Sequence, residues 1–213
     1  MNRRIFYLFG LFAPLLFVFT AILGGALRPG YSHISDTVSE LFSLGSPNRV
    51  LLTILYILFS VSLSLFGFGL IQLVQYKGKY KRLGEWAAYI FILVGVLNIL
   101  TATVFPQDPW GSLPTFPGEM HMILSGIISL LSLLYMLLFG IWLRQVEIAK
   151  FFWVYSLVTI AGAILSGDWF AASFGTPLMG ITERVAILVG FQWTFLLSIL
   201  IIKYDTQLTS QSS

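Results

Sequence analysis

The chain has 213 residues, of which 57% are apolar and only 10% are charged, and its mean hydropathy is strongly positive. A soluble domain carries about a quarter charged residues, so this composition excludes an ordinary soluble protein and indicates a membrane protein. The chain has no cysteine, which excludes disulfides, thiolate zinc sites and cysteine nucleophiles. The net charge of +3 is small, and the basic residues lie near the ends of apolar segments, so we expect no nucleic-acid partner.

Six apolar stretches reach or approach the ~20 residues that a helix needs to cross the hydrocarbon core of a bilayer. They are continuous and rich in Leu, Ile and Phe, without the alternation of a lipid-facing β-strand. The sequence therefore predicts an all-α, polytopic six-helix bundle in a single domain over residues 1–213. The predicted spans are residues 5–27, 50–74, 85–105, 119–143, 151–173 and 181–202. The first is longer than a signal-peptide core of about 7–15 residues, so we expect it to be retained.

The basic residues predict the orientation of this bundle, because positive charges are retained on the cytoplasmic side during insertion. With both termini in the cytoplasm, the inner basic residues are Arg3, Arg4, Lys77, Lys79, Lys81, Arg82, Arg144, Lys150 and Lys203. That arrangement leaves Arg28, Arg49 and Arg184 outside. We therefore expect a multi-pass protein of the cell membrane whose motif-bearing loops are extracytoplasmic.

The three outer connections carry most of the polar residues that could do chemistry. They read RPGYSHISDTVSELFSLGSPNR, FPQDPWGSLPTFPGEMH and SFGTPLMGITER, and they hold both histidines, His33 and His121. Six carboxylates fall in these connections or in the outer leaflet: Asp36, Glu40, Asp108, Glu119, Asp168 and Glu183. Acidic residues contribute little to topology, so insertion does not explain this concentration. We predict an outward-facing polar pocket.

The first outer connection is predicted to fold onto the bundle. Apolar residues recur in it at helical spacing: Ile34, Val38, Leu41 and Phe42. This pattern predicts a short helix over residues 34–43, and Thr37 with Glu40 has the spacing of a capping box, although Ser32 or Ser35 could begin the helix instead. The carboxylates of Asp36 and Glu40 would then lie on its other face, in water or at the roof of the pocket.

Charged residues closer to the membrane interior need partners. Asp168 lies about five residues inside the outer end of the fifth span, where an ionised carboxylate requires a compensating cation. The candidates are Arg184, Arg28 or a bound cation, and Arg184 is preferred because it begins the next span. Glu183 and Arg184 are adjacent and point about 100° apart on a helix, so we expect only one of them to face a given neighbour. Hydrogen bonding that only holds the helices together is the alternative.

We predict that these groups converge on one site that recognises, and hydrolyses or remodels, a lipid headgroup. The residues predicted to be catalytic are Asp36, Glu40, His121 and Asp168. The residues predicted to bind the ligand are Arg28, Ser32, His33, Ser39, Asp108, Glu183 and Arg184. A guanidinium group would bind phosphate, and carboxylates would bind an amine or a sugar. A small-molecule transporter and a non-catalytic structural or accessory subunit are the alternatives.

Three motifs carry a resemblance to a known family. The stretch RPGYSHISDTVSELFSLGSPN near the N-terminus, then FPQD before a histidine, and GITERV followed by a tryptophan resemble the prokaryotic membrane family known as domain of unknown function 998. The resemblance covers nearly the whole chain and implies six spans with an unassigned biochemical role. That family is similar in architecture, distantly, to the Frag1-like membrane proteins, some of which are linked to lipid-anchor remodelling.

The last prediction from the sequence concerns a site for a divalent metal. Alkaline ceramidases and adiponectin-receptor-like membrane hydrolases hold zinc with three histidines, whereas this chain has two. A zinc site would need His33, His121 and a carboxylate such as Asp36 or Asp108, which is an acceptable catalytic ligand set. The spacing gives no support, because the chain contains no His-x-x-x-His, Glu-x-x-His or Gly-x-Ser-x-Gly motif.

Overall fold

The computed structural model describes residues 3–75 and 79–210, and this part of the chain contains helices and no β-strand. Lys77, one of the predicted inner basic residues, lies outside the described residues. The long helices are α1 (Arg3–Leu27), α2 (Arg49–Val74), α3 (Lys81–Thr103), α4 (Phe116–Leu143), α5 (Phe152–Ala172) and α6 (Met179–Ser210). All six are long and apolar enough to cross a membrane, so the protein is an all-α, multi-pass membrane protein.

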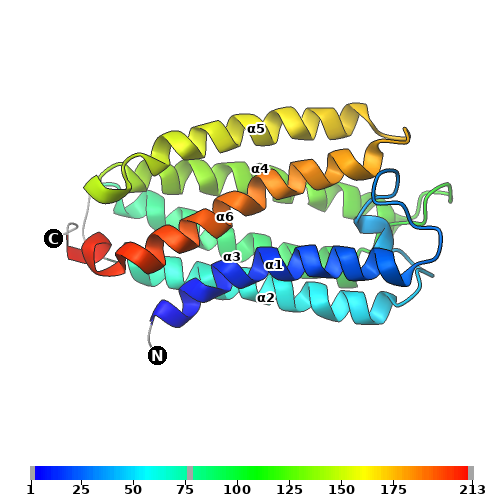
Figure 1. The fold of residues 1–213 in the computed structure, drawn as a ribbon, viewed down its shortest axis with the longest axis horizontal. Helices are drawn as coiled ribbons and strands as arrows, with labels where there is room; N and C mark the ends of the chain where they lie inside the picture. The colour runs from blue at the N-terminus through cyan, green and yellow to red at the C-terminus, as the bar shows by residue number, and fades with distance from the viewer. Residues whose placement is uncertain (1–2, 76–78, 211–213) are drawn as a thin grey trace.

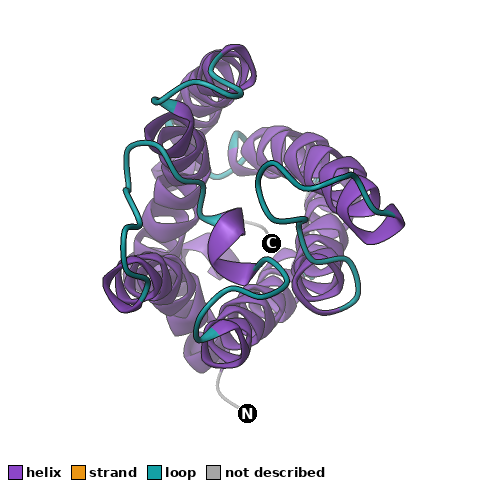
Figure 2. Cartoon of the chain, turned by 90° about the vertical axis from the view of Figure 1, so that its right-hand side faces the viewer, coloured by secondary structure: helices purple, strands orange, loops and turns teal. Residues whose placement is uncertain are grey.

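Each helix packs against its neighbours in the sequence, and α6 packs against α1, which closes the bundle into a ring. Both termini lie at one end, which we call the terminal end, and the α1–α2 connection lies at the other, which we call the loop end (Figure 1). In the view onto the loop end, a short 3₁₀ helix, η1 (Ser39–Phe42), lies inside the ring (Figure 2).

In the terminal half of the ring, buried side chains of α4, α5 and α6 meet. There Trp193 of α6 is fully buried, lies 5.6 Å from the ring of Tyr135, and donates a hydrogen bond from Nε1 to Ser156 Oγ at 2.9 Å. In the loop half, by contrast, none of residues 122–134 of α4 is buried, although helical periodicity would bring several of them to the bundle side. The loop halves of α4 and α5 therefore present much of their surface to their surroundings.

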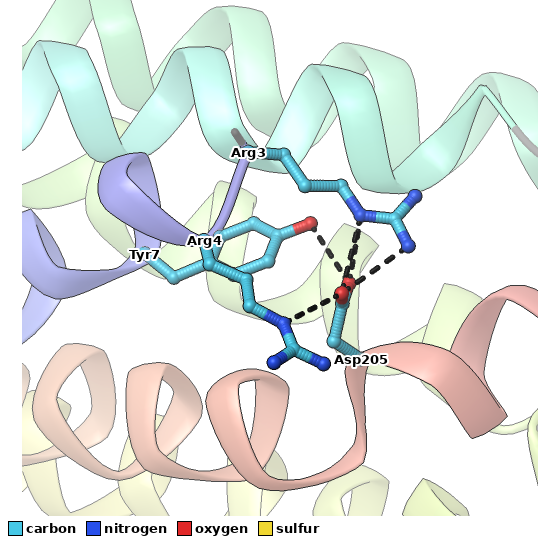
Figure 3. Close-up of polar contacts among 4 residues, drawn as sticks. All are labelled: Arg3, Arg4, Tyr7 and Asp205. Atoms are coloured by element: carbon cyan, nitrogen blue, oxygen red, sulfur yellow. Dashed lines mark hydrogen bonds and ion pairs between the residues drawn. The ribbon is translucent and has the colours of Figure 1, made fainter. Parts of the chain in front are cut away.

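The helix ends lie within four residues of the predicted spans, except that α6 continues to Ser210. Its helical geometry is interrupted at Tyr204 (φ −117°, ψ 16°), and the next residue, Asp205, turns toward the start of α1. The buried carboxylate of Asp205 accepts the Tyr7 hydroxyl at 3.3 Å and pairs with Arg3 at 3.0 Å and Arg4 at 3.4 Å (Figure 3). These polar contacts connect the end of α6 to the start of α1, where the helix dipole favours a carboxylate.

Candidate functional site

The helix predicted over residues 34–43 is reduced to the single turn of η1. Val38 and Phe42 are buried as expected, whereas Ile34 is 57% exposed. An α-helix would need the main-chain oxygens of residues 33 and 36 as acceptors for N–H groups four residues later, but Arg184 binds both of these oxygens. The preceding turn is closed instead by the Asp36 carboxylate, which accepts the Ser32 N–H at 2.9 Å.

The capping box is confirmed. The N–H of Thr37 donates to Glu40 Oε2 at 3.0 Å, and the N–H of Glu40 donates to Thr37 Oγ1 at 3.3 Å. The prediction that Glu40 faces water or a pocket is wrong, because only 7% of the residue is exposed. Burial raises the pKa of its carboxyl, and the hydrogen bond from Thr37 opposes this shift. Glu40 stabilises the turn and does not present a free carboxylate.

Glu183, at the start of α6, holds the same segment from the other side. Its buried carboxylate accepts the Val38 N–H and, at 3.0 Å, the Ser39 hydroxyl. The N-terminus of η1 is thus capped by a residue 145 positions away in the sequence. Ser39 and Glu183, both predicted to bind a ligand, bind one another.

Arg184 binds main-chain carbonyl groups of the same segment. Its Nη1 donates to the main-chain oxygens of His33 at 2.9 Å, Asp36 at 2.8 Å and Gly180 at 2.7 Å, and its Nη2 donates to the Tyr31 hydroxyl. The expectation that Glu183 and Arg184 cannot share a neighbour is wrong. The first connection is wide enough for two side chains 100° apart to reach different parts of it.

The two remaining arginines of the loop end follow the same pattern. Arg28 donates to the main-chain oxygen of Glu40 at 3.0 Å, and Arg49 donates to that of Phe42 at 3.0 Å. Within residues 3–75 and 79–210, none of these arginines, Arg184 included, forms an ion pair with a carboxylate. Their donors satisfy carbonyl groups of the irregular connection, which would otherwise lack partners near the membrane.

His121 and Asp108 belong to a separate part of the loop end, the α3–α4 connection. Nδ1 of the buried His121 lies 2.9 Å from the main-chain oxygen of Phe105, just beyond α3. The Asp108 carboxylate accepts the Thr115 N–H at 2.8 Å and its hydroxyl at 2.7 Å, and these hydrogen bonds lower the pKa of Asp108. Both side chains contact residues of the α3–α4 connection. A hollow of about 440 Å³ beside Asp108 and Glu119 does not reach the residues of the first connection.

The predicted pairing of Asp168 with Arg184 is wrong, and so is the convergence of Asp36, Glu40, His121, Asp168 and Arg184 in one pocket. Asp168 is exposed, and the oxygens bound by Arg184 come from other residues. Asp168 precedes the end of α5 by four residues, which places it about 6 Å along the axis at ~1.5 Å per residue. At that depth water and lipid headgroups can solvate a carboxylate, so no internal cation is needed.

The predicted metal site of His33, His121 and Asp36 is not formed. In the part of the chain that the structure describes, no three His, Asp or Glu side chains lie close enough together to hold a metal ion. His33 lies on the first connection and is exposed, whereas His121 is buried beside the α3–α4 connection. The two histidines therefore belong to different surfaces.

The loop end does contain a groove between α1 and α6, with a volume of about 210 Å³. Its apolar walls are formed by Phe17, Val18, Ala21, Ile22, Ile34, Val38, Ile181 and Leu188, and its polar residues are His33 and Arg184. We call this space the α1–α6 groove. Partial desolvation and the charge of Arg184 lower the pKa of His33, so its imidazole is mainly neutral at pH 7. The groove can accommodate an apolar chain, and the side chains of His33 and Arg184 are among its walls.

Two residues that organise this site were not among the predicted site residues. Tyr31 lies against both guanidinium groups, with Arg28 5.7 Å and Arg184 5.6 Å from its ring centroid, and burial raises its pKa to about 12. Gly180 lets α6 approach the turn, since a Cβ there would lie 2.4 Å from the Asp36 main-chain oxygen. The Gly-x-x-Glu-Arg spacing was a usable signal, because it puts all three contact residues in the first turns of α6.

Comparison with known proteins identifies the family of this chain. The family model described as a protein of unknown function (DUF998) matches residues 11–200. No curated protein and no solved structure matches the chain. Both stretches that contact each other at the loop end, residues 28–48 and 180–184, lie inside the matched region.

Proposed function

The chain belongs to this family of membrane proteins of unknown function, and from that premise we propose that it binds a membrane lipid at its loop end. The lipid would place an acyl chain in the α1–α6 groove and its headgroup beside His33 and Arg184. The proposal depends on the composition of the groove. Eight of its lining residues are apolar, and the other two are His33 and Arg184. Pockets between the helices of a bundle with a few polar groups at one end are typical ligand sites.

The position of the groove supports a lipid over a water-soluble ligand. Ile22, Ile181 and Leu188 are 59%, 36% and 45% exposed, so the walls are open to the surroundings of the bundle. In a membrane these surroundings are hydrocarbon, which solvates an acyl chain and its binding site alike. A polar solute would reach the same walls only by leaving water, at a cost of several kcal/mol.

Replacing Val18 by tryptophan is expected to block the groove and lower the amount of co-purified lipid by about tenfold. Native mass spectrometry of the detergent-purified protein counts the lipids that stay bound. The control is Leu15→Trp, because Leu15 is 59% exposed on α1 and is not a wall of the groove. Equal lipid retention by the two variants would contradict the proposal.

We also propose that the loop end is extracytoplasmic, which the asymmetry of basic residues supports. A reporter that is active only in the cytoplasm should then work after Lys203 and fail at Ser112. Both fusion sites are exposed. A fusion after Lys203 follows the last predicted span, residues 181–202, and displaces Asp205 from its contacts with Arg3 and Arg4. The reverse activity pattern would place the groove in the cytoplasmic leaflet.

A further inference from the structure

Among the described residues, no carboxylate forms an ion pair with Arg184, whose side chain is one of the walls of the α1–α6 groove. All partners of the Arg184 guanidinium are neutral: three main-chain oxygens and the Tyr31 hydroxyl. The adjacent carboxylate of Glu183 is engaged with the N-terminus of η1. Hydrogen bonds to carbonyl groups orient the guanidinium but leave its net charge in place.

The neighbouring carboxylate of Asp36 likewise forms no ion pair within the part of the chain that the structure describes. The Asp36 carboxylate accepts the Ser32 N–H and the Ser35 hydroxyl, both at 2.9 Å. Only the main-chain oxygen of Asp36 reaches Arg184, at 2.8 Å, while its carboxylate is turned to the neighbouring serines. The loop end thus presents two opposite charges on adjacent groups that do not bind each other.

Two such charges near the edge of a bilayer are complementary to a ligand that carries both signs. Fixed charges attract opposite charges on a ligand, and electrostatic complementarity of this kind favours specificity. Asp36 belongs to the same turn as His33, which lines the groove, since the Asp36 N–H donates to the Ser32 oxygen at 2.8 Å. Asp36 is not a wall of the groove, so a headgroup lying over the groove would extend across this turn to meet its carboxylate.

We propose that the lipid headgroup is zwitterionic, with a phosphate facing Arg184 and His33 and an ammonium group facing Asp36. The inference rests on the proposed function of the groove and specifies its ligand class. The wider charge of the loop end favours a lipid without net charge over an anionic one. Only three arginines, Arg28, Arg49 and Arg184, are present there with six carboxylates, namely Asp36, Glu40, Asp108, Glu119, Asp168 and Glu183.

The test is a competition among three lipids in nanodiscs that contain equal amounts of phosphatidylethanolamine, phosphatidylglycerol and diacylglycerol. The full-length protein is released into detergent, and native mass spectrometry counts the lipids that remain bound. Wild type should retain phosphatidylethanolamine about five- to tenfold over phosphatidylglycerol, which lacks the ammonium group, and by more over diacylglycerol, which lacks both charges. Asp36→Asn should abolish the preference for phosphatidylethanolamine over phosphatidylglycerol.

Two variants separate the charge of Asp36 from its part in the turn. Ser35→Ala removes one hydrogen bond of the carboxylate and keeps its charge, and Asp168→Asn removes an exposed charge elsewhere at the loop end. Both should keep the wild-type preference. If wild type retains the two phospholipids equally and Val18→Trp releases both, the proposal of a zwitterionic headgroup is wrong, while the proposal that the groove binds a lipid is supported. A wild-type protein that retains no lipid would overturn both proposals.

Discussion

Replacing Glu183 by alanine is expected to lower the free energy of unfolding by about 2–4 kcal/mol. The change removes the charge-assisted hydrogen bonds that cap η1 and leaves the N–H of the buried Val38 without an acceptor. Glu183→Gln should cost less, because its amide oxygen can still accept a hydrogen bond. Thermal or denaturant unfolding in detergent micelles measures the difference.

The same variant should open the first connection. Because the chain has no cysteine, Leu41→Cys introduces a single thiol, and Leu41, in η1 of that connection, is fully buried. The thiol should react slowly with a maleimide in the otherwise native protein and rapidly when Glu183 is alanine. Glu119→Ala is the control, since Glu119 is exposed in the first turn of α4. If both changes leave stability and labelling at the wild-type level, Glu183 does not hold the connection.

Replacing Asp205 by alanine is expected to destabilise the terminal end by about 1–3 kcal/mol. Its carboxylate is 4% exposed and faces Arg3 and Arg4, so its loss leaves two guanidinium groups beside a vacated acceptor. The estimate lies below that for a fully buried pair, because the Arg3 and Arg4 side chains are 24% and 57% exposed and water screens them. The unfolding midpoint in detergent is the measurement.

The matched control is Glu147→Ala in the short helix η2 (Glu147–Ala149). Glu147 also forms an ion pair, with Lys150, but the two side chains are 73% and 42% exposed. An exposed pair contributes about 0–1 kcal/mol, so this variant should unfold close to the wild-type midpoint. Equal destabilisation by Asp205→Ala and Glu147→Ala would show that the terminal cluster is an ordinary surface ion pair.

The local features of the loop end were predictable because they depend on neighbours in the sequence. Thr37 and Glu40 lie three residues apart, and their reciprocal hydrogen bonds form as the capping-box spacing indicates. The burial of Val38 and Phe42 follows in the same way from the spacing of apolar residues. The length of the helix did not follow, because Arg184, far away in the sequence, binds the carbonyl groups on which that helix depends.

The predicted pocket was wrong for a related reason. The sequence analysis paired charged side chains with one another, Asp168 with Arg184 above all, or with a ligand. In the structure Arg28, Glu183 and His121 contact mostly main-chain groups of the connections. Main-chain donors and acceptors occur at nearly every residue and leave no signature in the sequence, so such pairings are hidden from it.

By itself the sequence determined that the protein crosses the membrane with six helices and where these helices lie. A run of about 20 apolar residues is a local property, and in lipid a helix satisfies its main-chain hydrogen bonds within that run. Only the tertiary structure decided that α6 packs against α1 and that Glu183 and Arg184 bind residues 31–39. It also decided that a groove lined by one histidine and one arginine lies between α1 and α6. These features depend on which helix faces surround the irregular connection, because its carbonyl and N–H groups must find partners wherever the ring of helices provides them.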